Sequence, residues 1–242
     1  MSYKKFLGLA AVIALVGCSE TPVSENNEDT DLPDFIIHRS PSAVREAVAS
    51  NDNRISVQAS SNNEFASKMY SQLAESENGN LFFSPFSIIS ALGMADAGAK
   101  GETDQQIRKA LSVQLPADDF HAALNGLDQS IESYAATVNN LEFKNVNSIW
   151  SHNGQGFALK MGYLDKLEVN YGAGVNLLNF SENPDSSRII INDWVSEQTN
   201  NRINELLPAG SINSLTRVVL TNAIYFLADW KVKFDVTRTK NE

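Results

Sequence analysis

Hydrophobic and polar positions alternate along this chain in patterns that predict both helices and strands. In some segments apolar residues recur at three- and four-residue spacing, which predicts a helix with one buried face; in others they recur at every second position, which predicts a strand. Helices are predicted over 62–73, 85–99, 103–111, 117–135 and 183–199, and strands over 81–83, 141–150, 175–180 and 216–227. A mixture of this kind in 242 residues fits one globular domain that contains both helices and strands.

The predicted helix 85–99 is apolar nearly all round, so we expect it to be buried on every side. Ser84 and Pro85 stand at its start in the order expected of an N-cap and a first helical residue. Thr103 and Gln106 have the spacing of a capping box, which predicts that a shorter helix begins there.

The predicted strand 216–227 is hydrophobic on both of its alternating faces. Such a run is typical of a central strand that is covered on both sides. Asn222 lies among apolar neighbours on one face, and a buried amide costs roughly a few kcal/mol unless its donors and acceptors are paired. The pattern therefore predicts a polar partner for Asn222 inside the fold. Asn145 and Asn147 share one face of the strand 141–150.

The amino terminus has the pattern of a bacterial export signal. Lys4 and Lys5 precede the apolar run 6–17, which is too short to cross a bilayer as a helix. Cys18 follows directly, and the sequence Leu-Val-Gly-Cys that it ends resembles a lipobox, in which the cysteine is acylated and becomes the first residue. We expect residues 1–17 to be a signal peptide and Cys18 to be the lipid attachment site. A simple secretory signal with an incidental cysteine is the alternative.

Residues 18–60 are predicted to comprise the lipidated Cys18 and a flexible tether, followed by a globular domain over 61–242. Residues 19–34 are polar and acidic, so they cannot bury enough apolar surface to offset the entropy of ordering. The stretch 42–50 has the pattern of a weak helix. Because Cys18 is the single cysteine, an internal disulfide is excluded.

The formal net charge of −10 argues against a nucleic acid partner, whose phosphates an acidic surface would repel. It also argues against electrostatic docking on anionic lipid, so membrane attachment would come from the acyl chains on Cys18. The three histidines, His38, His121 and His152, have no metal-ligand spacing, and we expect each on the surface. No nucleophile elbow, phosphate loop or dinucleotide fingerprint is present. We therefore expect no enzyme activity, no metal and no cofactor.

Several motifs resemble one family in their order and spacing. Residues 80–88 and 97–103 resemble the second-helix region of serpins, 192–195 resemble the family's sixth helix, and 220–226, followed by Trp230, resemble the third strand of its main sheet. The resemblance extends from about residue 60 to 242. It implies a serpin-like α+β fold, with amino-terminal helices packed on part of a large mixed or antiparallel central sheet that is incomplete in this chain.

The resemblance also implies a role for particular residues. In serpins a polar cluster, the shutter, lies beneath the centre of the main sheet, and the matching positions here are Ser84, Ser87 and Asn222. Trp230 corresponds to the breach, at the top of the sheet where insertion begins. A fully hydrophobic seam would resist parting, whereas a small polar cluster can exchange hydrogen bonds between two states.

The function that the resemblance implies is inhibition of a serine-type endopeptidase by conformational trapping. A monomeric inhibitor is cleaved in its reactive loop by a serine or cysteine protease, and the loop then inserts into the sheet. In the family that loop follows the matched region, so we expect it to be absent from this chain and residues 1–242 to be inactive alone, with an unpaired apolar edge on the last strand.

The sequence is also compatible with two other classes of protein. A non-inhibitory serpin-like binding lipoprotein would carry every motif seen here, and an enzyme would need catalytic residues outside this chain. In each case we expect an exported protein, lipid-anchored to the bacterial cell envelope at the outer membrane and facing the periplasm or the extracellular space.

Overall fold

A computed structural model describes residues 7–15, 35–154, 158–232 and 236–238 of the chain. The described helices are α1 (Asn53–Ser76), α2 (Pro85–Gly98), α3 (Glu102–Ala110), α4 (Ala117–Thr137), α5 (Met161–Tyr171), α6 (Pro184–Gln198) and the short 3-10 helix η1 (Val236–Arg238). The described strands are β1 (Leu7–Leu15), β2 (Ile36–His38), β3 (Glu142–His152), β4 (Val175–Leu178) and β5 (Val218–Leu227).

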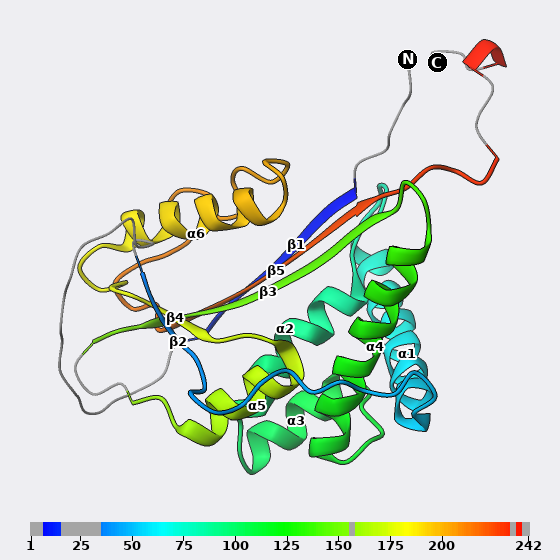
Figure 1. Cartoon of the computed structure of the whole chain (residues 1–242). Helices are drawn as coiled ribbons and strands as arrows, with labels where there is room; N and C mark the ends of the chain where they lie inside the picture. The colour runs from blue at the N-terminus through cyan, green and yellow to red at the C-terminus, as the bar shows by residue number, and fades with distance from the viewer. Residues whose placement is uncertain (1–6, 16–34, 155–157, 233–235, 239–242) are drawn as a thin grey trace.

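The strands form one mixed sheet in the order β1-β5-β3-β4-β2. Only the β3–β4 pair is parallel, and the other three pairs are antiparallel. Helix α6 covers one face of this sheet, and the remaining α-helices gather on the other face (Figure 1). The expected α+β class, with helices packed on part of a mixed sheet, is confirmed.

Helix α2 forms the core of the more heavily covered face. Ala91, Met94 and Ala97 are buried there in one cluster with Ile149 of β3 and Leu220 of β5. The nearly all-apolar sequence of α2 is explained by its place between the sheet and the helices α1, α3, α4 and α5.

Helix α6 closes the opposite face. Its residues Ile191 and Val195 are fully buried against Trp150 of β3 and against Val219 and Ala223 of β5. Strand β5 is therefore covered on both sides, as its two hydrophobic faces predicted.

The amino-terminal segment differs from the prediction. No helix forms over 42–50; this stretch runs without regular structure along α4 and α5, and the preceding residues 36–38 add β2 to the edge of β4. The first helix begins at Asn53, so α1 crosses the boundary that was placed between residues 60 and 61. The predicted strand at 81–83 does not form either.

The capping box predicted at Thr103 is also wrong. Helix α3 begins one residue earlier, at Glu102, after Gly101, whose φ of 62° lies in the left-handed region that favours glycine. Gln106 donates its side-chain hydrogen bond to the Glu102 carboxylate and not to a backbone amide.

Strand β1 comes from the segment predicted to be a signal peptide. It pairs antiparallel with β5 over nine residues, with Ala11 opposite Asn222. The expectation that the last strand has an unpaired edge is therefore wrong for the chain as it stands. Removal of residues 1–17 would uncover that edge, and Cys18 itself lies outside the described residues. Among the described helices, none has the length and apolar character needed to span a bilayer.

Candidate functional site: a polar cluster at the centre of the sheet

Asn222 is fully buried in the middle of β5, on the face that carries Leu220 and packs on α2. Its side-chain Nδ2 donates to the Oδ1 atoms of Asn145, at 2.9 Å, and Asn147, at 2.6 Å. Both acceptors lie on β3, and the antiparallel register sets Asn147 directly opposite Asn222. The polar partner that the sequence required is thus a pair of asparagines on the neighbouring strand.

The cluster is not fully satisfied. The Oδ1 atom of Asn222 is buried without a hydrogen-bond partner in the described part of the chain, and so, separately, is the Oγ atom of Ser87 on α2. A buried polar atom left unpaired costs about 1–3 kcal/mol. The centre of this sheet therefore carries a local penalty that an apolar seam would not.

The two serines predicted to join the cluster come from the start of α2. Ser84 is the N-cap, and its Oγ accepts a hydrogen bond from the Ser87 backbone N–H at 3.2 Å, so the predicted cap is confirmed. Within the described residues, hydrogen bonds join Asn222 to the two β3 asparagines, whereas Ser87 Oγ makes none. The grouping of Ser84, Ser87 and Asn222 as one functional unit remains a prediction.

Polar side chains also cross the sheet on the face under α6. The indole Nε1 of Trp150 donates to Thr221 Oγ1 at 3.1 Å, which ties β3 to β5. On the other side of β3, the Asn176 amide of β4 donates to Ser148 Oγ and to the backbone carbonyl of Ile149. Sequence patterns missed these bonds, because alternation assigns each residue a face but not a cross-strand partner.

Trp230 lies three residues beyond the end of β5 and is 57% exposed. Its predicted place at the top of the sheet, where an inserting strand would enter, stays a prediction.

A second polar cluster lies between α2, α4 and α5. His121 is 1% exposed, and its Nδ1 atom lies 2.7 Å from the Tyr171 hydroxyl oxygen. Its Nε2 atom lies 3.6 Å from Asp96 Oδ2, too far for a hydrogen bond, and both Asp96 oxygens lack hydrogen-bond partners in the described part of the chain. The expectation of a surface position is therefore wrong for His121, whereas His38 is exposed and His152 is partly buried.

Burial shifts both groups toward their neutral forms. Desolvation, with a smaller contribution from the nearby Asp104 charge, raises the pKa of Asp96 to about 6, against the opposing effects of Arg108 and Lys166. Desolvation and the Lys166 charge lower the pKa of His121 to about 4.

Three further groups complete the surroundings of this pair. The Asp118 charge raises the pKa of His121, whereas the burial of His121 lowers it. Desolvation, with Asp96 and Tyr163 nearby, raises the pKa of Tyr171 far above its usual value, so its hydroxyl stays protonated. No group of three or more His, Cys, Asp or Glu residues that could hold a metal ion occurs among the described residues.

Comparison with known proteins identifies the family. The family model described as "Serpin (serine protease inhibitor)" matches residues 60–242, which is most of the chain. The chain belongs to the serpin family.

Serpins and serpin-like proteins from archaea and from animals resemble this chain. An uncharacterized serpin-like protein of the archaeon Thermococcus kodakarensis is 33% identical over 94% of this chain and 51% of its own length. Human Serpin B3 is 34% identical over 75% of this chain and 49% of its own length, and mouse Antithrombin-III is 30% identical over 93% and 51%. The chain thus spans about half the length of the curated relatives it matches.

Two solved serpin-fold structures resemble this chain at the level of the backbone. Arabidopsis AtSerpin1, in a conformation described as native stressed, matches with a TM-score of 0.65 at 26% identity, over 81% of this chain and 48% of that chain. Emu ovalbumin matches with a TM-score of 0.66 at 26% identity, over 76% and 50%. The predicted serpin-like arrangement of helices on part of a mixed sheet is confirmed by these matches.

Proposed function

We propose that the protein to which these residues belong is a serine-type endopeptidase inhibitor that works by conformational trapping. The observation that carries the proposal is the polar, incompletely paired cluster around Asn222 in the centre of a sheet that is covered on both faces. Family membership and the similarity to Antithrombin-III support it.

The cluster suits a sheet that must open and close again around an added strand. Parting two apolar strands exposes hydrophobic surface with no compensating contact, which costs about 25 cal/mol for each Å² of apolar surface exposed. Asparagine and serine side chains can instead exchange one hydrogen bond for another as the strands move. The unpaired oxygens of Asn222 and Ser87 offer such alternative bonds.

The chain's length relative to its relatives bears on where inhibition resides. Because residues 1–242 match about half of each relative, we propose that the reactive loop belongs to a part of the protein that follows the matched region. Residues 1–242 expressed alone would then form no covalent complex with a serine or cysteine protease.

We also propose that the protein is exported, monomeric and lipid-anchored to the bacterial envelope through Cys18. The support is the lipobox-like sequence ending at Cys18 after a short apolar run. Mass spectrometry of the purified protein would find an acylated amino-terminal cysteine after removal of residues 1–17. A Cys18→Ser variant that still partitions with membranes would contradict the anchor.

The inhibitor proposal is tested with the complete protein and a panel of serine and cysteine proteases. The expected result is a protease complex that survives SDS and that disappears when the protease nucleophile is removed beforehand. A complete protein that is only cleaved as a substrate, or only bound reversibly, by every protease would overturn the proposal. Reversible binding would instead favour a non-inhibitory serpin-like binding protein.

A further inference from the structure

The segment before α1 is held firmly on the helices. We call residues 39–48 the N-terminal strap. At its beginning, Arg39 donates to the Glu168 carboxylate at 3.0 Å and to the Gly172 carbonyl at 3.1 Å, both at the end of α5. Ser40 donates to Asp165 Oδ1 at 2.7 Å. The strap therefore begins with a polar attachment to α5.

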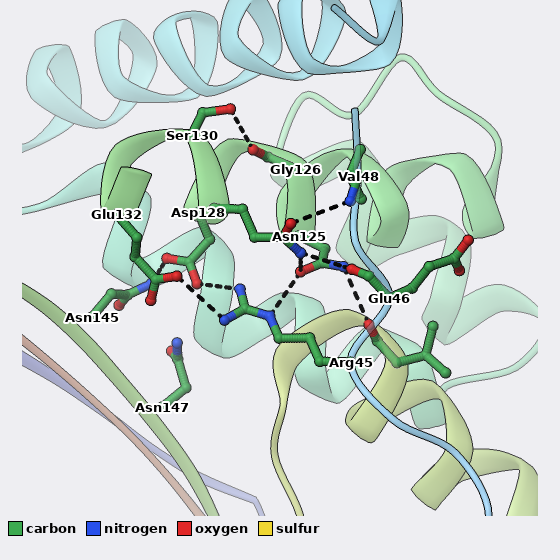
Figure 2. A network of polar contacts seen from close by, with 12 residues as sticks. Arg45, Glu46, Val48, Asn125, Gly126, Asp128, Ser130, Glu132, Asn145 and Asn147 are labelled. Carbon is green, nitrogen blue, oxygen red and sulfur yellow. Dashed lines mark hydrogen bonds and ion pairs between the residues drawn. The ribbon is translucent and has the colours of Figure 1, made fainter. Parts of the chain in front are cut away.

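The second half of the strap attaches to α4 through Arg45. The guanidinium Nε donates to Asn125 Oδ1 at 2.9 Å, and Nη2 donates to Asp128 Oδ2 at 2.6 Å (Figure 2). Nη1 lies 3.5 Å from Glu132 Oε2. The Asp128 side chain is 14% exposed, so this ion pair is shielded from water much better than an ordinary surface pair.

The backbone of the strap is paired as well. The Glu46 N–H donates to the Val169 carbonyl at 3.0 Å, and the Glu46 carbonyl accepts from the side-chain amides of Asn125 and Gln129, each at 2.7 Å. The Val48 N–H donates to Gln129 Oε1 at 3.2 Å (Figure 2). The strap is thus a fixed part of the helical layer.

Asp128 connects the strap to the sheet. While its Oδ2 accepts from Arg45, its Oδ1 accepts from Asn145 Nδ2 at 2.8 Å (Figure 2). The Oδ1 of Asn145 in turn accepts from Asn222 Nδ2 at 2.9 Å. Four side chains from the strap, α4, β3 and β5 therefore form one continuous path: Arg45, Asp128, Asn145 and Asn222.

The chemistry of this path fixes the orientation of each amide. A carboxylate only accepts hydrogen bonds, so Asn145 must present its NH2 group to Asp128 and its oxygen to Asn222. Without Arg45, Asp128 and Glu132 would face each other four residues apart with no cation, and like charges at that spacing repel. Burial and the Asp128 charge already raise the pKa of Glu132.

We propose that docking of the N-terminal strap regulates the central polar cluster, with Arg45 and Asp128 acting as positioning residues that hold Asn145 and, through it, Asn222. When the strap leaves α4, Asp128 loses its cation, Asn145 loses its fixed orientation, and the β3–β5 seam loosens at Asn222. The regulatory meaning rests on the proposed inhibitor function, whereas the coupling between strap and seam does not.

Hydrogen exchange of the complete protein, followed in peptides that cover β3 and β5, tests the coupling. Arg45→Gln is expected to speed exchange in β5 about tenfold, the effect of losing the charge-assisted hydrogen bond to Asp128, which is the Arg45 contact that lies on the path. The matched control is Arg39→Gln, which removes a strap contact to α5 that is outside the path. It should change exchange in β5 by less than about twofold.

A second variant distinguishes coupling through the path from a general loosening of the protein. With Asn145→Ala in place, Arg45→Gln should add less than about twofold to exchange in β5, because the path is already broken. Equal effects of the Arg39 and Arg45 variants, or an undiminished Arg45 effect in the Asn145→Ala background, would overturn the proposal. Unchanged protection in α6 identifies variants that remain folded. If Arg45→Gln fails this check, Arg45→Lys, which keeps the charge but not the Nε bond to Asn125, must give an intermediate rate.

Protease assays on the same variants keep the two proposals apart. If the protein inhibits, Arg45→Gln changes the rate at which the SDS-stable complex forms, and Arg39→Gln does not. If the complete protein inhibits no protease while Arg45→Gln still speeds exchange in β5, the coupling stands and the proposed function fails.

Discussion

The buried pair of Asp96 and His121 makes a prediction about pH that can be worked out group by group. Burial raises the pKa of Asp96 from 3.8 to about 6, so its native form prefers the proton. The stability that this preference contributes is present below pH 3.8 and is lost as the pH rises to 6. Burial lowers the pKa of His121 from 6.5 to about 4, so the stability linked to its neutral form is present above pH 6.5 and is lost as the pH falls to 4.

The two contributions have similar size and opposite slope. Each factor of ten in an acid constant corresponds to about 1.4 kcal/mol, so each group changes the free energy of unfolding by about 3 kcal/mol across its window. In the parent protein they largely cancel between pH 4 and 6, because folding in effect moves a proton from His121 to Asp96. The pair should therefore contribute almost no pH dependence to the free energy of unfolding of the parent, and a pH dependence should appear only when one of the two residues is replaced.

The assay is thermal unfolding of the parent and of two variants from pH 4 to 7. As the pH rises from 4 to 6, the free energy of unfolding of Asp96→Asn should increase by about 3 kcal/mol relative to that of the parent, which corresponds to about 6–12 °C in the unfolding midpoint. The free energy of unfolding of His121→Asn should decrease by about the same amount, relative to that of the parent, as the pH rises from 4 to 6.5. A constant offset from burying an amide does not affect either slope.

The double variant Asp96→Asn, His121→Asn serves as the control, since it should run parallel to the parent across the whole range. Difference curves of the single variants that are flat, or that slope in the same direction, would refute the reasoning. In that case burial would not hold both groups in their neutral forms.

Two further predictions concern packing and hydrogen bonding. Gly93→Ala places a Cβ 2.7 Å from the Tyr171 hydroxyl oxygen, so it should destabilise the protein by about 1–3 kcal/mol, whereas Gly162→Ala, in a helix with open space around it, should raise the thermal midpoint slightly. Asn192 is 5% exposed and exchanges hydrogen bonds with both the N–H and the carbonyl of Leu207, so Asn192→Ala should cost about 3 kcal/mol in urea unfolding. An Asn192→Ala variant with an unchanged urea midpoint would contradict that role.

The elements with strong local signals could be predicted from the sequence. Helix α2 has a serine cap, a proline and an apolar surface all round, and β5 has two hydrophobic faces. These signals depend only on neighbouring residues, so they survive without knowledge of the fold.

The first half of α1 could not be predicted in this way. Its buried residues there are polar, namely Gln58, Ser61 and Asn62, so hydrophobic periodicity does not mark the helix. The strap was missed for a related reason, since the residues that bind Arg45 follow about 80 positions later in the chain. His121 follows Asp118 and Asp119 by two to three residues in the sequence, and only its partners on α2 and α5 reveal that it is buried.

Two serines three positions apart at the start of α2 should respond to the same substitution with opposite signs. Ser84→Ala removes the N-cap hydrogen bond and should cost about 1 kcal/mol. Ser87→Ala removes a fully buried hydroxyl that has no partner in the described part of the chain and leaves the Ser87 backbone N–H in place, so it should stabilise by about 1 kcal/mol.

The rate at which the protease complex forms shows whether the Ser87 hydroxyl has a role in inhibition. If the Ser87 hydroxyl serves only when the sheet opens, Ser87→Ala should slow formation of the protease complex while it raises the thermal midpoint, a trade of activity for stability. A lower midpoint for Ser87→Ala would mean that the hydroxyl is bonded in the closed sheet. An unchanged inhibition rate would mean that the buried Ser87 hydroxyl only destabilises the fold and has no part in the opening of the sheet.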